Sequence, residues 1–148
     1  LQSHPELQLG EVQRLYGTVY PEGGEVLASR YRLDYHRQHN DQANFASAAI
    51  DHYTRYPSDD PDELNEMASI FAEEMSEPAQ LQIALGWVKK AVSLQETSYY
   101  QFTLAKVWAK MGKKKAAKKA ATRSLELAKA EGEDTMLVEE LLEGLKKK

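Results

Sequence analysis

Apolar residues recur along this chain at intervals of three and four positions, which is the period of one face of an α-helix. The clearest run follows Asp60-Pro61, where an aspartate can cap the first turn and a proline suits the first helical position. Its apolar positions are Leu64, Met67, Ala68, Phe71, Ala72 and Met75. No segment qualifies as a strand, so the sequence predicts an all-α fold.

Local start and stop signals divide the rest of the chain into further helices. Asn40-Asp41, Thr97-Ser98 and Asp134-Thr135 supply N-caps, and Gly112 and Gly132 are natural left-handed stops. The predicted helices cover about residues 25–38, 41–56, 61–75, 81–92, 98–111, 113–131 and 135–148. Residues 1–20 are the least regular part.

The last two helices have contrasting apolar faces. The face of the helix over 113–131 is nearly all small, with Ala117, Ala120, Ala121, Ser124 and Ala128. Small residues allow two helices to approach closely. The final helix has a stripe of Leu137, Val138, Leu141, Leu142 and Leu145 opposite a polar face, which is typical of a terminal cap on a stacked helical array.

Two stretches of the chain repeat at an offset of 33 positions. Phe71-Ala72-x-x-Met75 recurs as Leu104-Ala105-x-x-Trp108, and Ala84-x-x-x-Val88-x-x-Ala91-Val92 recurs as Ala117-x-x-x-Ala121-x-x-Ser124-Leu125. A repeat of this length, built from two helical patterns, is typical of helix–turn–helix solenoid units.

The second copy resembles the tetratricopeptide repeat in Leu104-Ala105-x-x-Trp108-x-x-Met111-Gly112, with Ala117, Ser124 and Leu125 after it. The first copy is a looser match, and the helix with Ala49, Tyr53 and Tyr56 is similar to half of a degenerate third unit. The resemblance implies antiparallel helix pairs stacked as a short right-handed superhelix. We expect one domain over residues 1–148, with irregular N-terminal helices in 1–39, repeats in 40–132 and a capping helix in 133–148.

A narrower resemblance connects two segments with the C-terminal helical tail of bacterial thioredoxin-fold, thiol-disulfide isomerase-like proteins. The segments are Tyr56-Pro57-Ser58-Asp59-Asp60-Pro61-x-x-Leu64-Asn65-x-x-Ala68 and Ala84-Leu85-x-Trp87-Val88-Lys89-Lys90-Ala91-Val92. In that family a thioredoxin-like domain precedes the helices, so we expect any redox domain to lie upstream of Leu1. Because the chain starts at Leu1 rather than Met, we expect a processed form or a fragment. No signal peptide is visible, and the resemblance leaves the bacterial periplasm and cytoplasm both open.

Composition and charge further restrict the functions that the chain can have. The chain is 42% hydrophobic and 28% charged, has no cysteine, and carries a net charge of −4. Thiolate catalysis and zinc–thiolate sites are therefore excluded within it, and no apolar run nears the roughly 18 residues of a membrane span. The charge is polarised, because residues 56–88 hold eight acidic and no basic residues, whereas residues 106–130 hold eight lysines.

No constellation of residues points to catalysis, a cofactor or a metal. Acidic pairs such as Asp59-Asp60 and Glu73-Glu74 are interpreted as caps and solvated faces. A metal site needs three or four converging ligands, and we interpret His36, His39 and His52 as surface or helix-terminal residues instead.

The lysine-rich helix over 113–131 is open to several interpretations. Alanine fills its apolar face, which disfavours insertion into a membrane surface, and nucleic-acid modules are usually basic overall. We interpret its lysines as a solvated face, with pairing to an acidic partner as an alternative. One candidate for this acidic partner is the region Asp59–Glu77 of another copy of the chain, so self-association is one expectation.

The predicted functional surface is the groove of the repeat, because in the tetratricopeptide family the first helix of each pair lines the concave face. The resemblance places in it Glu66, Ser69, Glu73, Tyr99, Phe102, Lys106 and Lys110. We predict a non-enzymatic module that binds a protein or peptide, with Phe102 as the main anchor. The alternatives are a purely structural tail, a substrate-positioning domain of a thiol-disulfide oxidoreductase, and a nucleic-acid-binding protein that uses the lysine helix.

Overall fold

The computed structural model describes residues 9–12, 14–15 and 23–147, and within these ranges it contains helices and no strand. The all-α prediction is therefore confirmed for this part of the chain. The contacts define two compact units, one within Leu1–Pro57 and one within Ser58–Lys148. Most of the irregular start predicted over residues 1–20 lies outside the described residues.

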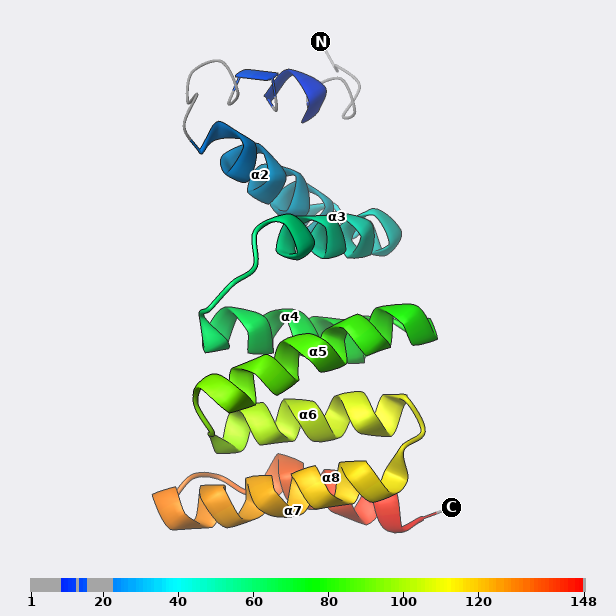
Figure 1. The fold of residues 1–148 in the computed structure, drawn as a ribbon. Helices are drawn as coiled ribbons and strands as arrows, with labels where there is room; N and C mark the ends of the chain where they lie inside the picture. The colour runs from blue at the N-terminus through cyan, green and yellow to red at the C-terminus, as the bar shows by residue number, and fades with distance from the viewer. Residues whose placement is uncertain (1–8, 13, 16–22, 148) are drawn as a thin grey trace. The chain divides into compact units, whose positions relative to one another are not determined.

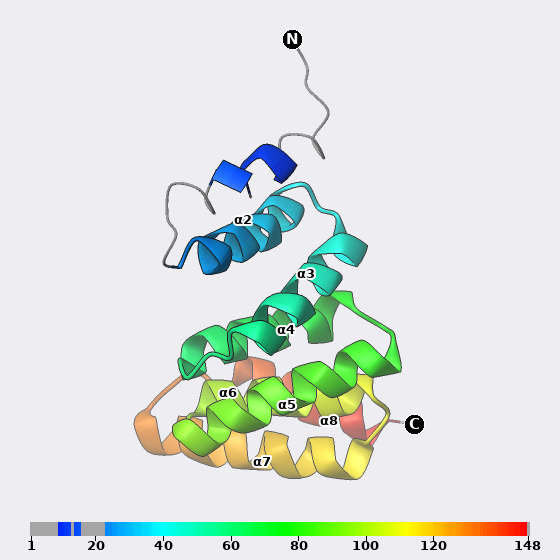
Figure 2. The same cartoon turned by 45° about the horizontal axis from the view of Figure 1, so that its top comes forward.

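The first unit contains α2 (Gly24–Gln38) and α3 (Gln42–Arg55), which form an antiparallel hairpin (Figure 2). His52 Nδ1 lies 2.8 Å from Ser29 Oγ and connects the two helices. This histidine lies in the last turn of α3, as its interpretation as a helix-terminal residue requires, but it is only 3% exposed and is therefore not a surface residue. A buried imidazole needs a hydrogen-bond partner, and the hydroxyl on α2 supplies one. The helix over residues 42–55, which we placed in the repeat region, belongs to this unit.

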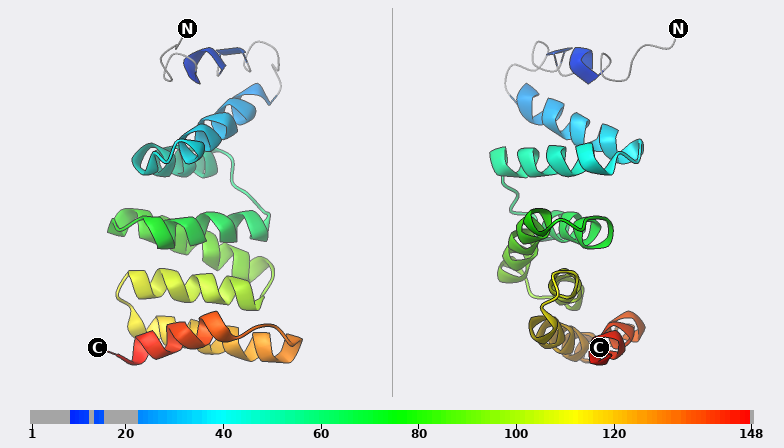
Figure 3. Two further views of the ribbon diagram at one scale, coloured as in Figure 1. Left: turned by 180° about the vertical axis from the view of Figure 1, so that it is seen from behind. Right: turned by 90° about the vertical axis from the view of Figure 1, so that its right-hand side faces the viewer.

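The second unit contains two helix pairs and a final helix (Figure 1). The first repeat is α4 (Pro61–Glu74) with α5 (Pro78–Leu94), and the second repeat is α6 (Ser98–Lys110) with α7 (Lys114–Glu131). Successive helices run in opposite directions, as the views in Figure 3 also show. The last helix, α8 (Met136–Lys146), packs on α7 and α6.

Several helices begin or end at the predicted local signals, whereas α5 begins at Pro78, before the predicted start near Leu81. The side chains of Asp41 and Thr97 accept hydrogen bonds from the third backbone N–H after them, at 3.2 and 3.1 Å. Asp60 accepts one from the N–H of Asp62, and Pro61 is the first residue of α4. Gly132 ends α7 with φ +70°, a conformation that is strained for any residue with a Cβ atom.

Equivalent helices of the two repeats lie side by side and parallel. The Tyr100 hydroxyl on α6 donates to Asp62 on α4, and Lys106 on α6 donates to Ser69 on α4. The two contacts join residues with nearly the same sequence separation, which happens only when two helices point the same way. The packing of α4 on α6 brings one face of each helix onto a common surface.

Alanines occupy the positions where the helices of the second unit cross. Ala68, Ala84, Ala91, Ala105, Ala117 and Ala121 are all completely buried. A methyl side chain at a buried position lets neighbouring backbones approach closely. Ala84, Ala91, Ala117 and Ala121, which belong to the small positions of the two repeats, are among these buried alanines.

The final helix covers the second repeat with only part of its predicted stripe. Val138 and Leu145 are buried against Ala117 and Ala121, and Leu141 and Leu142 pack beside them. Leu137 is 65% exposed, so its place in the buried stripe was wrongly predicted. A stripe of five apolar residues is wider than the single face that α7 and α6 offer to α8.

Candidate functional site

All seven predicted groove residues lie on α4 and α6, and contacts or a shared hollow connect five of them into one surface. We call this surface the α4/α6 face and define it by Ser69, Glu73, Tyr99, Phe102 and Lys106. The spacing of three and four positions within each helix keeps these side chains on one side. The other two predicted residues, Glu66 and Lys110, are exposed on the same helices.

Lys106 is the centre of this face. Its ammonium donates to Ser69 Oγ at 2.8 Å and to Glu73 Oε1 at 3.1 Å, and it lies 5.1 Å from the centre of the Phe102 ring. The lysine side chain is half-buried whereas that of Glu73 is 64% exposed. The pair therefore consists of a fixed cation and an anion that solvent reaches freely.

Tyr99 lies at the α8 end of the face and is 65% exposed. A hydrogen bond with Glu133, together with the charge of that carboxylate, raises the pKa of the Tyr99 hydroxyl above its ordinary value. A shallow hollow of about 70 Å³ runs from Tyr99 and Phe102 to Leu137 on α8. The hollow is large enough for part of one side chain and no more.

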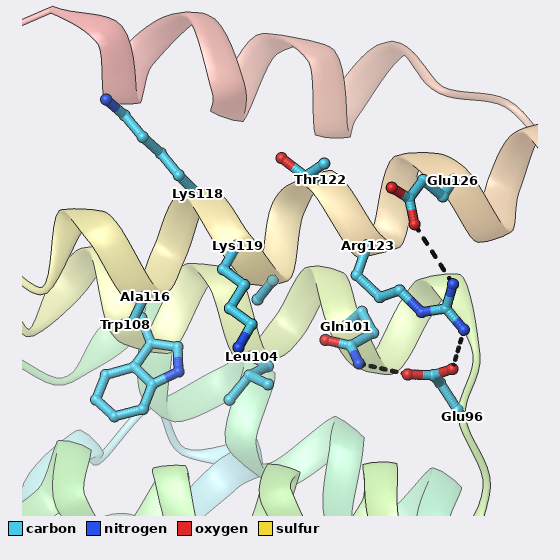
Figure 4. Close-up of a pocket in the computed structure, with 11 residues that line it drawn as sticks. Glu96, Gln101, Leu104, Trp108, Ala116, Lys118, Lys119, Thr122, Arg123 and Glu126 are labelled. Carbon is cyan, nitrogen blue, oxygen red and sulfur yellow. Dashed lines mark hydrogen bonds and ion pairs between the residues drawn. The ribbon is translucent and has the colours of Figure 1, made fainter.

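A much larger pocket lies on another side of α6. We call it the α6/α7 pocket; its volume is about 820 Å³. Leu104 and Trp108 from α6 and Ala116 and Ala120 from α7 give it apolar walls. Figure 4 shows Lys119 extending from α7 toward Leu104 on α6. In addition, the ammonium of Lys89 on α5 lies 5.1 Å from the centre of the Trp108 ring.

A network of hydrogen bonds closes one end of the α6/α7 pocket (Figure 4). Arg123 donates to Glu96 at 2.6 Å and to Glu126 at 3.4 Å, and Gln101 donates to Glu96 at 2.8 Å. These bonds, with that from Arg123 the strongest, lower the pKa of the Glu96 carboxyl below its ordinary value. The carboxylate consequently stays charged and keeps Arg123 in place.

The sequence did not predict the α6/α7 pocket. Leu104 and Trp108 match the large apolar positions of the repeat, which suggested burial, yet both remain half-exposed. A signal was present in the sequence, because α7 has alanine at two positions, Ala116 and Ala120, where the first repeat has Ile83 and Trp87.

The described residues include no group of three or more His, Asp or Glu side chains arranged to hold a metal ion. His36 lies 3.7 Å from Asp41, and His39 Nδ1 lies 2.8 Å from the carbonyl oxygen of Tyr35. Burial lowers the pKa of His36, although the charge of Asp41 acts in the opposite direction. No helix in the described ranges combines the length and apolarity needed to cross a bilayer.

Comparison of the chain with models of known protein families, with curated proteins and with solved structures gives no match.

Proposed function

We propose that residues 58–147 form a tetratricopeptide-like, non-enzymatic module that binds a protein or peptide on the α4/α6 face. In this proposal the two repeats and α8 make a short right-handed superhelix, and the module is the helical tail of a larger thioredoxin-fold protein. The observation that carries it is the parallel packing of α4 on α6, which combines side chains of two repeats in one surface.

The chemistry of Lys106 supports the choice of this face. An ion pair whose acidic partner is exposed contributes about 0–1 kcal/mol, so a carboxylate of a ligand can displace Glu73 at little cost. Ser69 then still holds the lysine ammonium above the Phe102 ring. Such a ligand needs a carboxylate next to an apolar group that packs on Phe102 and Tyr99.

The test is selection of peptides from a random displayed library against the full chain of 148 residues. Selected peptides should shift the backbone amide signals of Ser69, Glu73, Tyr99 and Lys106. Phe102→Ala should weaken their binding by about 2 kcal/mol, or roughly 30-fold, because aromatic anchors dominate interface energetics.

Two further variants control for loss of structure. Tyr99→Ala alters an exposed side chain on the same face, so it should weaken binding without changing the melting temperature. Leu94→Ala removes an exposed apolar side chain near the end of α5 and should leave binding unchanged. The proposal fails if both Phe102→Ala and Tyr99→Ala remain folded and bind the selected peptides as the unaltered chain does.

A further inference from the structure

The α6/α7 pocket exists because the second repeat lacks side chains that fill the same place in the first. In the first repeat Trp87 on α5 packs edge-on against Phe71 on α4, with ring centres 4.9 Å apart. Thirty-three positions later, Phe71 corresponds to Leu104 and Trp87 corresponds to Ala120. Replacing an indole by a methyl group leaves the Leu104 side of α6 uncovered.

A second substitution enlarges this space. Ile83 on α5 corresponds to Ala116 on α7, again 33 positions later. Ala116 and Ala120 are one turn apart and both line the pocket. The missing groups are therefore two large apolar side chains with the i, i+4 spacing of a helix.

Lysines at one end of the pocket form no ion pair among the described residues. Lys119 lines both the α6/α7 pocket and an adjoining hollow that includes Lys113, Lys114 and Lys115. Among the described residues, the ion pairs found include none made by Lys113, Lys115 or Lys119. The opposite end of the pocket is neutralised by Arg123 with Glu96 and Glu126. The unpaired positive charge is thus confined to the end near Ala116.

We propose that the α6/α7 pocket binds an acidic amphipathic helix of a partner protein, which inserts large apolar side chains where the first repeat has Ile83 and Trp87. Its acidic residues pair with Lys115 and Lys119. The stretch from Lys113, the N-cap of α7, to Glu126 extends over about 20 Å, which is the length of a helix of about 14 residues. This inference goes beyond the proposed function, since it concerns a different side of α6 from the α4/α6 face.

Chemistry and burial disfavour the other occupants. A phosphodiester backbone has no large apolar group to place against Leu104 and Ala120, which line the pocket. The acidic helix of a second copy, α4, has Leu64 and Phe71 buried in its own core. These two side chains are therefore not available for insertion unless the copy unfolds.

The probe is a synthetic helical peptide of about 14 residues, with leucine and phenylalanine at i, i+4 on one face and glutamates on the other. Binding to the full chain is measured by calorimetry and by the indole N–H signals of Trp87 and Trp108. The Trp108 signal should shift and the Trp87 signal should not. A peptide of scrambled order, with the same charge, should not bind.

Ala120→Trp restores the side chain that the first repeat has, and it should reduce affinity for the peptide about tenfold or more by filling the pocket. Lys119→Glu should weaken binding about fivefold or more, because an attraction becomes a repulsion. Lys129→Glu makes the same change of charge on α7 outside the pocket lining and should have little effect. Tyr99→Ala should also have none, which separates this test from that of the proposed function.

Several results would overturn the inference. One is equal binding of the scrambled peptide; another is equal weakening by Lys119→Glu and Lys129→Glu. A folded Ala120→Trp variant with unchanged affinity is a third, and if that variant does not fold, the comparison of the two lysines decides.

Displacement of the peptide by polyuridylate or by phosphatidylserine vesicles at lower concentration would assign the lysines to phosphate binding. Self-association that Lys119→Glu abolishes would make a second copy the occupant.

Discussion

Adding bulk at Ala117 should destabilise the second unit, whereas the same change at its neighbour Ala116 should not. Ala117 is completely buried among Ala105, Ala121 and Val138. Ala117→Leu adds three carbons at a position with no exposed surface, and overpacking of a core typically costs about 1–3 kcal/mol. Ala116 lines the open α6/α7 pocket, so leucine there can project into it.

The size of the contrast follows from the two surroundings. Ala116→Leu buries some additional apolar surface, at roughly 0.8 kcal/mol for each methylene that becomes fully buried, so it should be neutral or slightly stabilising. For a unit the size of Ser58–Lys148, each kcal/mol shifts the melting temperature by about 4–8 °C. We expect Ala117→Leu to lower it by about 4–24 °C relative to Ala116→Leu.

Thermal unfolding followed by far-UV circular dichroism measures this difference, and urea denaturation checks that the dependence on denaturant is unchanged. The two variants have the same composition and the same helix, so helix propensity cancels between them. Equal melting temperatures would refute both the tight crossing at Ala117 and the open pocket at Ala116.

Two further predictions concern glycines and a buried tyrosine. Gly132→Ala should lower the free energy of unfolding by about 1 kcal/mol, because residue 132 has φ +70°. Gly144→Ala should raise it by about 0.5–1 kcal/mol, because Gly144 lies inside α8 with open space around it. Melting curves of both variants test this. Tyr100→Phe should cost about 1–2 kcal/mol by removing the hydrogen bond to Asp62. Burial, followed by that hydrogen bond, raises the Tyr100 pKa to about 12, so its stabilisation is complete below about pH 10 and is lost as the pH rises through 12. Unfolding curves across this range should therefore converge for the variant and the unaltered chain.

The elements of the fold were predictable because their signals are local. The caps at Asp41 and Thr97 satisfy backbone groups three residues away, and Gly132 acts through its own φ angle. The repeat also indicated which alanines are buried, since a helix crossing selects small residues wherever it occurs. The same helical spacing places Ser69, Glu73 and Lys106 where their side chains are in contact, whereas the binding role of this face stays a prediction.

What covers each apolar side chain was decided by the tertiary structure. Leu137 and Trp108 belong to apolar stripes in the sequence, yet Leu137 lies in solvent and Trp108 lines a pocket. An apolar stripe in the sequence shows only that its side chains are apolar. Whether each one is buried depends on the side chains of a helix that is distant in the sequence. The sequence by itself determined helices, caps and close crossings, which depend on neighbours within about one turn. Only the packing of α6 on α7 showed that alanine in place of Trp87 leaves an open pocket.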